Sequence, residues 1–358
     1  IHERLVGSEM CIRDRHNSLR PQNHMVIECD FKQTKVQSFA PLDWQSATRE
    51  ACVDFVKNAG IVGLGGAGFP TYVKYMKPDG VDYVLINAVE CEPYITADYR
   101  SVMDDAKDLV TGAKIMKKMA EAKTVYICIK ESHPDLIEKV KSVLTDAAGV
   151  EVRPVPDVYP MGWERVLVRE VLHKEYGGLP AEAGAIIGNA SSAIAIAKAF
   201  EKGEAITQKN LTVSGECVKD PHNVCVPVGM PVSEIIEACG GYTQDTVRLI
   251  SGGPMMGKTI VNDMFVVDRA MNALTVLPAA NDDAIACLRC GKCSDHCPSG
   301  LQPVRITAAL KANDVDEMSK RGVMSCIECG MCTYICPSHI DVTENVRKAK
   351  RIVMLKKK

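Results

Sequence analysis

The chain has 358 residues, 16 of them cysteine, and its 43 basic and 45 acidic side chains leave a formal net charge of −2. A balance this close to zero excludes the strongly basic surface that binds nucleic acid through bulk electrostatics. The hydrophobic content of 46% is ordinary for a globular protein. No apolar run approaches the roughly 18 residues that predict a membrane-spanning helix. The cysteines are therefore the feature that needs explaining.

The first residues, IHERLVGSEMCIRDRHNSLR, show neither an apolar period nor strand alternation. Part of this segment, SEMCIRDR, resembles translated adapter read-through from sequence assembly. We therefore interpret residues 1–20 as an artefact or a disordered terminus, and we give Cys11 no functional weight.

Between residues 43 and 203, short apolar runs alternate with segments of helical spacing. Runs of this kind are typical of parallel strands, which are buried because helices cover both faces of the sheet. We therefore predict an α/β domain with a parallel sheet, whose strands are VDYVLINAV (81–89), TVYICIK (124–130), VEVRPVP (150–156) and AGAIIGN (183–189).

The segments between these runs carry apolar residues three and four positions apart, as amphipathic helices do. One helix is expected to begin at a Ser132 cap, with Pro134 in its first turn, and another to span 162–178 until paired glycines end it. The other predicted helices are 43–60, 104–122 and 190–203.

From about residue 204 the pattern changes to short strands around one helix. LTVSGECV, HNVCVPVG and TVRLISGGPMMG have strand character, and VSEIIEACGGY has helical spacing. We predict a small α+β domain over 204–280, with Cys217, Cys225 and Cys239 as buried small apolar residues. A basic helix, VRKAKRIVMLKKK, is expected over 346–358.

Eight cysteines are concentrated in two segments, CLRCGKCSDHCP and CIECGMCTYICP, of the form C-x2-C-x2-C-x3-C-P. This spacing is typical of ferredoxin-type 4Fe–4S clusters, in which the fourth cysteine of each run ligates the other cluster. Zinc, the competing interpretation, favours four ligands in two separated pairs. We predict a dicluster domain over 281–345, with one cluster on Cys287, Cys290, Cys293 and Cys336 and the other on Cys326, Cys329, Cys332 and Cys297.

A glycine-rich loop, GIVGLGGAGFPTYVKYMKP, formally contains G-x-G-x-x-G. An ordinary dinucleotide fold requires a strand directly before this motif and a helix directly after it. Here a predicted helix precedes the loop and Phe69-Pro70 follows it, so we reject the ordinary Rossmann interpretation. Taken alone, the loop is as compatible with a tight structural turn as with a binding site.

Together, GLGGAGFPTYVKY and LINAVECEPYITADYR resemble two flavin-site segments of the NADH-binding flavoprotein subunit of respiratory complex I. They resemble the RnfC family of the Rnf electron-transport complex more closely. YPMGWERVL, GGLP, IIGNASSAIAIAKAF, CGGY, SGGPMMG and the dicluster segment follow in the order of that family. The resemblance covers residues 25–355 and implies a flavoprotein-like α/β domain (43–203), then a β-grasp SLBB domain (204–280), then an all-α and loop ferredoxin-like dicluster domain.

The resemblance implies that FMN and NADH bind to the first domain. A glycine loop lets backbone amides approach a phosphate or a flat ring, because no Cβ intrudes. Lys74 and Glu92 are the expected catalytic residues, Lys74 as the cation that stabilises the reduced ring. Without the family context they would be a solvated lysine and part of a helix-start pair. The residues expected to bind FMN or NADH are Gly63, Gly65, Gly66, Gly68, Lys74, Asn87, Glu90, Glu92 and Asn189.

The implied function is an NADH-oxidising oxidoreductase subunit that passes single electrons through two 4Fe–4S clusters. Its partners would be the membrane and ferredoxin-like subunits of the ion-translocating Rnf complex, and it would be peripheral at the cytoplasmic face of the membrane. There the basic helix 346–358 would face a partner, the anionic membrane surface or solvent. Residues 21–42, around MVIECDF, would be the remnant of an N-terminal sandwich domain, so we expect a fragment.

Several positions depart from the pattern of the RnfC family, among them Met161, Trp163, NASS and DRAMNALTVLP. These departures favour two relatives as alternatives, the RnfC-like protein associated with proline reductase and the cobalamin reductase of propanediol metabolism. Both share the flavin and the two clusters but donate to another acceptor. A further alternative is a non-catalytic iron–sulfur relay or assembly module that binds no flavin.

Overall fold

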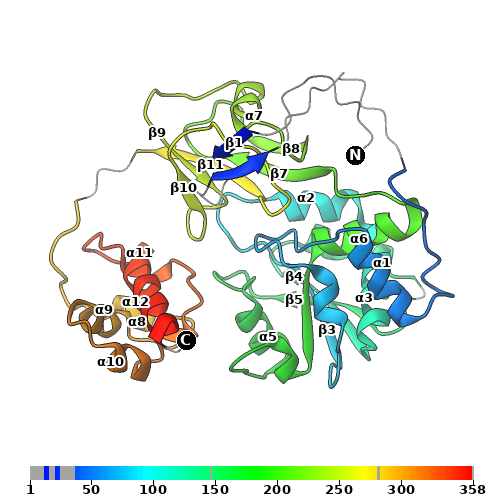
Figure 1. Cartoon of the computed structure of the whole chain (residues 1–358), viewed down its shortest axis with the longest axis horizontal. Helices are drawn as coiled ribbons and strands as arrows, with labels where there is room; N and C mark the ends of the chain where they lie inside the picture. The colour runs from blue at the N-terminus through cyan, green and yellow to red at the C-terminus, as the bar shows by residue number, and fades with distance from the viewer. Residues whose placement is uncertain (1–11, 16–20, 25–36, 146, 280–282, 357–358) are drawn as a thin grey trace.

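The computed structural model describes residues 12–15, 21–24, 37–145, 147–279 and 283–356 (Figure 1). Strands β1 (Ile12–Arg15) and β2 (Pro21–His24) pair antiparallel, so part of residues 1–20, interpreted as artefact or disorder, is a strand that pairs with the start of the predicted sandwich-domain remnant. The segment MVIECDF, predicted to be the end of a sandwich domain, lies outside the described residues.

A parallel sheet in the order β5-β4-β3-β6 forms the core of the first domain and confirms the predicted α/β class. Side chains alternate between its faces, so Val84 and Ile86 enter one hydrophobic cluster and Leu85 enters the other. The four strands agree closely with the predicted runs and are β3 (Tyr83–Ala88), β4 (Thr124–Lys130), β5 (Val150–Val155) and β6 (Ala185–Asn189).

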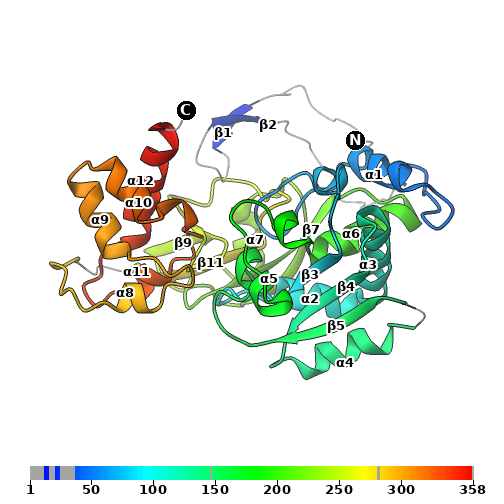
Figure 2. The same cartoon turned by 90° about the horizontal axis from the view of Figure 1, so that it is seen from below.

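Helices cover both faces of this sheet (Figure 2). On one face lie α1 (Arg49–Asn58), α3 (Ala106–Ala120), α4 (Pro134–Ser142) and α6 (Ala190–Lys202), which share a single hydrophobic cluster. On the other face α5 (Glu164–Leu172) packs against Leu85 and Ile187. Shorter helical segments are η1 (Thr71–Tyr75), α2 (Ala97–Asp104) and η2 (Pro180–Ala183).

Several predicted helix ends are wrong. The helix predicted over 43–60 begins at Arg49 rather than at residue 43. The N-cap of α4 is His133, because the hydroxyl of Ser132 instead donates to Oδ2 of Asp157 at 2.6 Å. Helix α5 ends at Leu172, well before the paired glycines, because His173 adopts the left-handed conformation with φ of 53°. A left-handed residue at this position ends a helix as a glycine commonly does.

The second domain is a mixed sheet in the order β10-β9-β11-β7-β8, with α7 (Val232–Ala238) contributing to its core. Cys217 and Cys239 are buried as predicted, but Cys225 is exposed on the edge strand β8, so that prediction is wrong. Strands β10 and β11 were not predicted. β10 is only three residues long, and β11 lacks a polar alternation because all its residues except Pro278 are buried. The strands are β7 (Gln208–Ser214), β8 (His222–Pro227), β9 (Val247–Ser251), β10 (Lys258–Ile260) and β11 (Ala273–Pro278).

The third domain consists of short helices and loops. Its last helix, α12 (Val342–Lys356), begins before the predicted basic segment, and Val346, Ala349 and Val353 are buried in the core of the domain. Among the described helices, none is long and apolar enough to cross a membrane. The remaining elements are α8 (Lys292–Asp295), α9 (Pro303–Lys311), α10 (Val315–Lys320), η3 (Val323–Ser325) and α11 (Met331–Tyr334).

Candidate functional site

The glycine-rich segment between α1 and η1 folds into a closed loop. The N–H of Gly63 donates to the carbonyl of Phe69 at 2.8 Å, and the N–H of Gly68 donates to the carbonyl of Gly63 at 3.2 Å. Gly66 and Gly68 have φ of +126° and +61°, a region that favours glycine. A helix precedes the loop and a 3₁₀ helix follows it, which agrees with the rejection of an ordinary dinucleotide fold.

One side of this loop is open, and the other rests on Asn189. A Cβ at Gly66 would meet nothing within 4 Å, whereas a Cβ at Gly65 would lie 2.9 Å from Nδ2 of Asn189. Within the described ranges, we find no hydrogen-bond partner for the amide N–H groups of Gly65, Gly66 and Ala67. Unpaired backbone amides beside open space suit an anionic or flat ligand, so this loop fits the phosphate or ring of a flavin.

Helix α6 and strand β7 hydrogen-bond to the loop at Leu64. The N–H of Leu64 donates to Oγ of Ser192 in α6 at 2.9 Å, and Nζ of Lys209 in β7 donates to the carbonyl of Leu64 at 3.0 Å. Lys209 is only 4% exposed. Burial lowers the pKa of this lysine, whereas the carboxylates of Asp98 and Glu90 act in the opposite direction. The second domain therefore supplies a buried lysine that donates to the loop of the first.

Asn87 and Asn189 face each other across β3 and β6, at the carboxyl edge of the sheet. Asn189 caps α6 and donates from Nδ2 to Oδ2 of Asp98 at 2.6 Å. Asn87 donates from Nδ2 to the carbonyl of Gly162 at 2.7 Å, and its Oδ1 accepts the N–H of Val89. Ligands of open α/β sheets bind at this edge.

Glu90 precedes α2, and its carboxyl group lies at the start of that helix, where it accepts hydrogen bonds from the backbone N–H groups of Asp98 at 2.7 Å and Tyr99 at 3.0 Å. Burial, followed by the charge of Asp98, raises the pKa of Glu90 to about 7, although the two backbone donors oppose the shift. Through Asp98 and Asn189, Glu90 belongs to the same contiguous group as Gly65.

Lys74 lies in η1, just after the loop, and its side chain is 31% exposed. Its Nζ donates to the carbonyl of Ile187 in β6 at 2.7 Å and pairs with Oε1 of Glu164 at 3.3 Å. These contacts hold the ammonium group at β6, next to the carboxyl edge of the sheet.

Glu92 is turned toward the second domain rather than toward the glycine loop. Its Oε1 accepts hydrogen bonds from the N–H groups of Met255 at 2.7 Å and Met256 at 2.9 Å. Burial raises the pKa of Glu92, and the two backbone donors and Tyr159 oppose that shift. The structure therefore separates Glu92 from Gly65, Glu90 and Asn189, and places its carboxylate at a domain boundary.

The same boundary includes the second cysteine motif, CIECGMCTYICP (326–337), which follows the first, CLRCGKCSDHCP (287–298). The hydroxyl of Tyr159 lies beside Glu92 and donates to the backbone carbonyl of Cys329. Ile327 and Cys329 belong to the hydrophobic cluster that α5 forms with the sheet. A Cβ at Gly330 would lie 2.3 Å from the carbonyl oxygen of Met255. The second motif therefore contacts both other domains.

Four cysteine side chains line one cavity in the third domain: Cys297, Cys326, Cys329 and Cys332. This is the set predicted for one cluster, with Cys297 supplied by the first motif. Among the described side chains, no three His, Cys, Asp or Glu residues are close enough to hold a single metal ion. A cubane is ligated at four separate corners, so an all-sulfur set around a cavity fits a 4Fe–4S cluster.

The first motif repeats the loop of the second. Arg289 and Glu328 have φ of 54° and 58°, and their N–H groups lie 3.4 Å from Sγ of Cys287 and Cys326 respectively. Two hydrogen bonds join the segment before Cys287 to Ser338, which follows Cys336. The N–H of Ile285 donates to the carbonyl of Ser338, and the hydroxyl of Ser338 donates to the carbonyl of Ala286, both at 3.1 Å. These contacts bring the chain at Cys287 and the chain at Cys336 together, as the predicted ligand set requires. Cys287 and Cys290 are exposed.

Three residues at these sites escaped prediction, namely Asp98, Tyr159 and Lys209. Lys209 alternates with Leu211 and Val213 along β7, so the strand period placed it on the buried side. The position of Lys209 on the buried side could therefore have been predicted from the sequence. The roles of Asp98 and Tyr159 could not, because their partners Asn189 and Cys329 are distant in the sequence.

Three family models match the chain in this order. The Nuo51 FMN-binding domain matches residues 56–198, the SLBB domain matches residues 210–259, and the 4Fe-4S dicluster domain matches residues 279–337. The parallel sheet, the mixed sheet and the cysteine motifs described above lie in these three regions.

Three similar curated proteins are the C subunits of ion-translocating complexes. That of the Na+-translocating ferredoxin:NAD+ oxidoreductase complex of Acetobacterium woodii is 34% identical and covers 100% of this chain and 83% of the relative. The proton-translocating counterpart of Clostridium ljungdahlii is 35% identical over 78% of this chain, and that of the ion-translocating complex of Rhodobacter capsulatus is 37% identical over 78%. This chain spans 63% and 56% of the lengths of those two relatives.

The fold also resembles a solved structure. A chain of an NAD+-reducing NiFe-hydrogenase in the H2-reduced state aligns with a TM-score of 0.59 at 14% identity, over 89% of this chain and 64% of that chain. At this identity the likeness concerns the fold alone. By its sequence similarity over most of the Acetobacterium relative, the chain belongs to the RnfC family, the C subunits of the ion-translocating ferredoxin:NAD+ oxidoreductase complexes.

Proposed function

We propose that this chain oxidises NADH at an FMN held by the glycine loop and passes single electrons through two 4Fe–4S clusters to a partner. The observation that carries the proposal is the set of unpaired amides of Gly65, Gly66 and Ala67 beside Asn189, at the carboxyl edge of the sheet. When bound, FMN would supply the exchange between two-electron and one-electron transfer, and the clusters would supply one-electron carriers.

The side chains at the sheet edge have distinct proposed roles. The amides from Gly65 to Ala67 would bind the flavin, and Asn189, against which Gly65 rests, would fix the loop. Lys74 would place a positive charge near the site, where it favours the anionic reduced ring. Asn87 and Glu90 would shape the rest of the pocket. Glu92 was predicted to be catalytic, and its bonds to Met255 and Met256 favour an additional role in holding the domains together.

The surroundings of the two cysteine sets favour an order for the clusters. In the set that lines the cavity, Cys326, Cys329 and Cys332 lie in the motif that contacts Tyr159 and the flavin domain, and Cys297 comes from the first motif. Cys329 is buried and the other three cysteines of this set are half-buried, so we call it the buried set. In the other set, which we call the exposed set, Cys287 and Cys290 are exposed and therefore accessible from outside. We infer that electrons from the flavin domain would reach the buried set first and leave through the exposed set.

The partners would be the membrane and ferredoxin-like subunits of an Rnf complex, with this chain peripheral at the cytoplasmic face of the membrane. The Acetobacterium relative is named as part of a Na+-translocating complex, which supports this assignment. Another reductase as acceptor, for proline or cobalamin, would use the same flavin and clusters.

Reconstitution with FMN, iron and sulfide tests the proposal. We expect the purified chain to retain FMN and to show its absorbance bleached by NADH under anaerobic conditions. Gly65→Ala should lose the flavin but keep the iron, since the two sites use different residues. A chain that retains its clusters but binds no FMN would support the relay or assembly module instead.

A further inference from the structure

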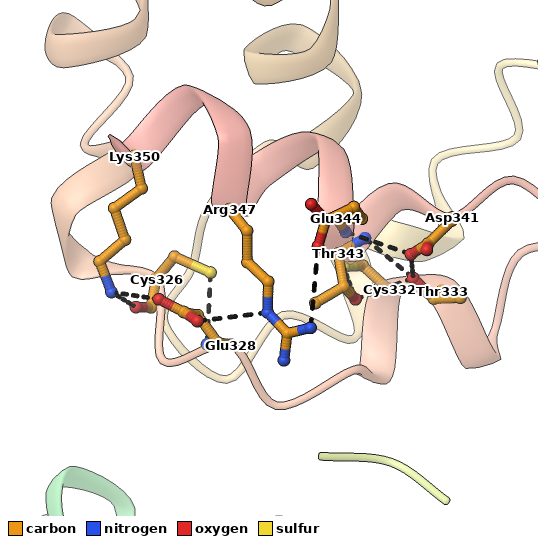
Figure 3. Close-up of polar contacts among 9 residues, drawn as sticks. All are labelled: Cys326, Glu328, Cys332, Thr333, Asp341, Thr343, Glu344, Arg347 and Lys350. Carbon is orange, nitrogen blue, oxygen red and sulfur yellow. Dashed lines mark hydrogen bonds and ion pairs between the residues drawn. The ribbon is translucent and has the colours of Figure 1, made fainter. Parts of the chain in front are cut away.

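The two cysteine motifs share one loop geometry but have different neighbours. Figure 3 shows the second motif beneath α12, which supplies Thr343, Arg347 and Lys350 to it. At the same spacing after the first motif, α9 carries Val304 where α12 carries Thr343. The second motif therefore has a hydroxyl group where the first has an apolar side chain.

Thr343 contacts a predicted cluster ligand directly. Its Oγ1 lies 3.3 Å from Sγ of Cys332, within the range for a hydrogen bond to sulfur, and the residue is only 5% exposed (Figure 3). A cysteine that ligates a metal is a thiolate and has no proton to donate. The hydrogen bond can then run in one direction only, from the hydroxyl of Thr343 to the sulfur of Cys332.

Neighbouring groups fix the orientation of that hydroxyl. The N–H of Thr343 donates to Oγ1 of Thr333 at 2.8 Å, and the hydroxyl of Thr333 lies 2.8 Å from Oγ1 of Thr343. The alternative acceptor for the hydroxyl of Thr333 is Oδ1 of Asp341, which lies further from that hydroxyl, at 3.2 Å, and also accepts the N–H of Glu344. With Thr333 as its donor, Thr343 has its own proton available for Cys332.

Ion pairs hold α12 on the motif. Nζ of Lys350 donates to the carbonyl of Cys326 at 2.8 Å and to Oε1 of Glu328 at 2.9 Å. Nε of Arg347 donates to Oε2 of Glu328 at 3.2 Å. The first motif has Arg289 in place of Glu328, so it lacks the corresponding anchor. These contacts account for Arg347 and Lys350 of the basic segment, and they keep Thr343 at the sulfur.

We propose that Thr343 tunes the reduction potential of the buried cluster and makes it higher than it would be without the hydroxyl. A hydrogen bond to a ligating sulfur stabilises the more negative, reduced state of the cluster, and such bonds are among the determinants of iron–sulfur potentials. The hydroxyl of Thr343 acts on one of the two clusters, because at the other the matching residue Val304 offers Cys293 its backbone N–H and no hydroxyl group, beside the hydroxyl of Ser294. This inference rests on the proposed function, specifically on the assignment of Cys332 as a ligand.

The test is a redox titration of the reconstituted full chain, in which EPR monitors the clusters. The signal that disappears in Cys332→Ser is assigned to the buried cluster. Thr343→Val keeps the shape and removes the hydroxyl. We expect the midpoint potential of this cluster to become more negative, so that its reduced-to-oxidised ratio at a fixed potential falls about tenfold, as for one charge-assisted hydrogen bond. The signal of the other cluster should keep its potential, and Thr343→Ser should restore the original value.

Thr307→Val is the matched control. Thr307 lies on α9, and its buried hydroxyl has no hydrogen-bond partner among the described residues, so both potentials should stay unchanged. If Thr343→Val fails to assemble, Thr343→Ala must give the same shift. Two intact clusters with unchanged potentials in the Thr343 variants would overturn this inference but leave the proposed function standing. Absence of any cluster signal from the wild-type chain would instead contradict the proposed function.

Discussion

The hydroxyl of Tyr159 donates a hydrogen bond to the backbone carbonyl of Cys329, which joins the first domain to a cysteine of the buried set. Burial raises the pKa of Tyr159, so its hydroxyl remains protonated and available as a donor. Beside it, Glu92 binds the turn of the second domain at Met255 and Met256. One small region therefore fixes all three domains relative to one another.

Replacing Tyr159 with phenylalanine should loosen this junction without removing a ligand of either proposed group. We expect flavin and iron contents close to those of the wild type, a loss of about 1 kcal/mol in unfolding free energy, and slower reduction of the clusters by NADH. Stopped-flow absorbance compares flavin and cluster reduction in the same trace. Tyr176→Phe, in the same hydrophobic cluster, is the control. Unchanged cluster reduction in Tyr159→Phe would show that the bond is irrelevant to electron transfer.

Replacing Gly65 with alanine should weaken flavin binding, because the new Cβ would lie 2.9 Å from Nδ2 of Asn189. The loop or Asn189 must then move, and the cradle is distorted. We expect at least about a tenfold rise in the dissociation constant for FMN, measured by flavin fluorescence. Gly177→Ala is a suitable control, since Gly177, like Gly65, has no positive φ, and its Cβ would meet only Oε2 of Glu182 at 3.9 Å. Equal FMN affinity in both variants would argue against the loop as the site.

Substitutions of single cysteines should group by cavity rather than by motif. Cys297→Ser should remove the same EPR signal as Cys326→Ser, although the two residues belong to different motifs. Cys336→Ser should remove the other signal, as should Cys287→Ser. The alternative outcome, in which Cys297→Ser and Cys287→Ser affect one cluster together, would contradict the interleaved ligand sets.

The raised pKa of Glu90 predicts a pH-dependent stability. The folded state keeps this carboxyl protonated up to about pH 7, whereas the unfolded carboxyl ionises near its ordinary value of 4.5. Between pH 4.5 and about pH 7, unfolding releases a proton from Glu90, so the unfolding free energy should fall as the pH rises through this range. Glu90→Gln should show a smaller fall in denaturant titrations across the same range. An identical slope in the two proteins would mean that Glu90 is ionised in the folded state.

The sequence predicted the strands of the parallel sheet and three of the five strands of the second domain, because apolar runs and periodicity are local properties. It failed at β11, whose residues are almost all buried and so lack alternation, and at the end of α5, where His173 takes a conformation usual for glycine. Cys225 was placed in the core because the sequence does not reveal that β8 is an edge strand.

The prediction of the candidate site had a similar limit. The sequence identified the glycine loop, Asn87, Asn189 and the cysteine spacing, but it did not reveal which side chains each residue would contact. Glu90 and Glu92 are two positions apart in the sequence, yet one binds the start of α2 and the other binds the second domain. Long-range partners of this kind depend on how the domains pack, which periodicity does not encode.

An anaerobic NADH titration of the reconstituted chain tests the proposed electron path most directly, with the flavin followed by absorbance and the clusters by low-temperature EPR. We expect NADH to reduce both clusters when FMN is bound and neither cluster in the FMN-free Gly65→Ala variant. Reduction of the clusters by NADH without FMN, or no reduction in the flavin-loaded wild type, would contradict the proposed path.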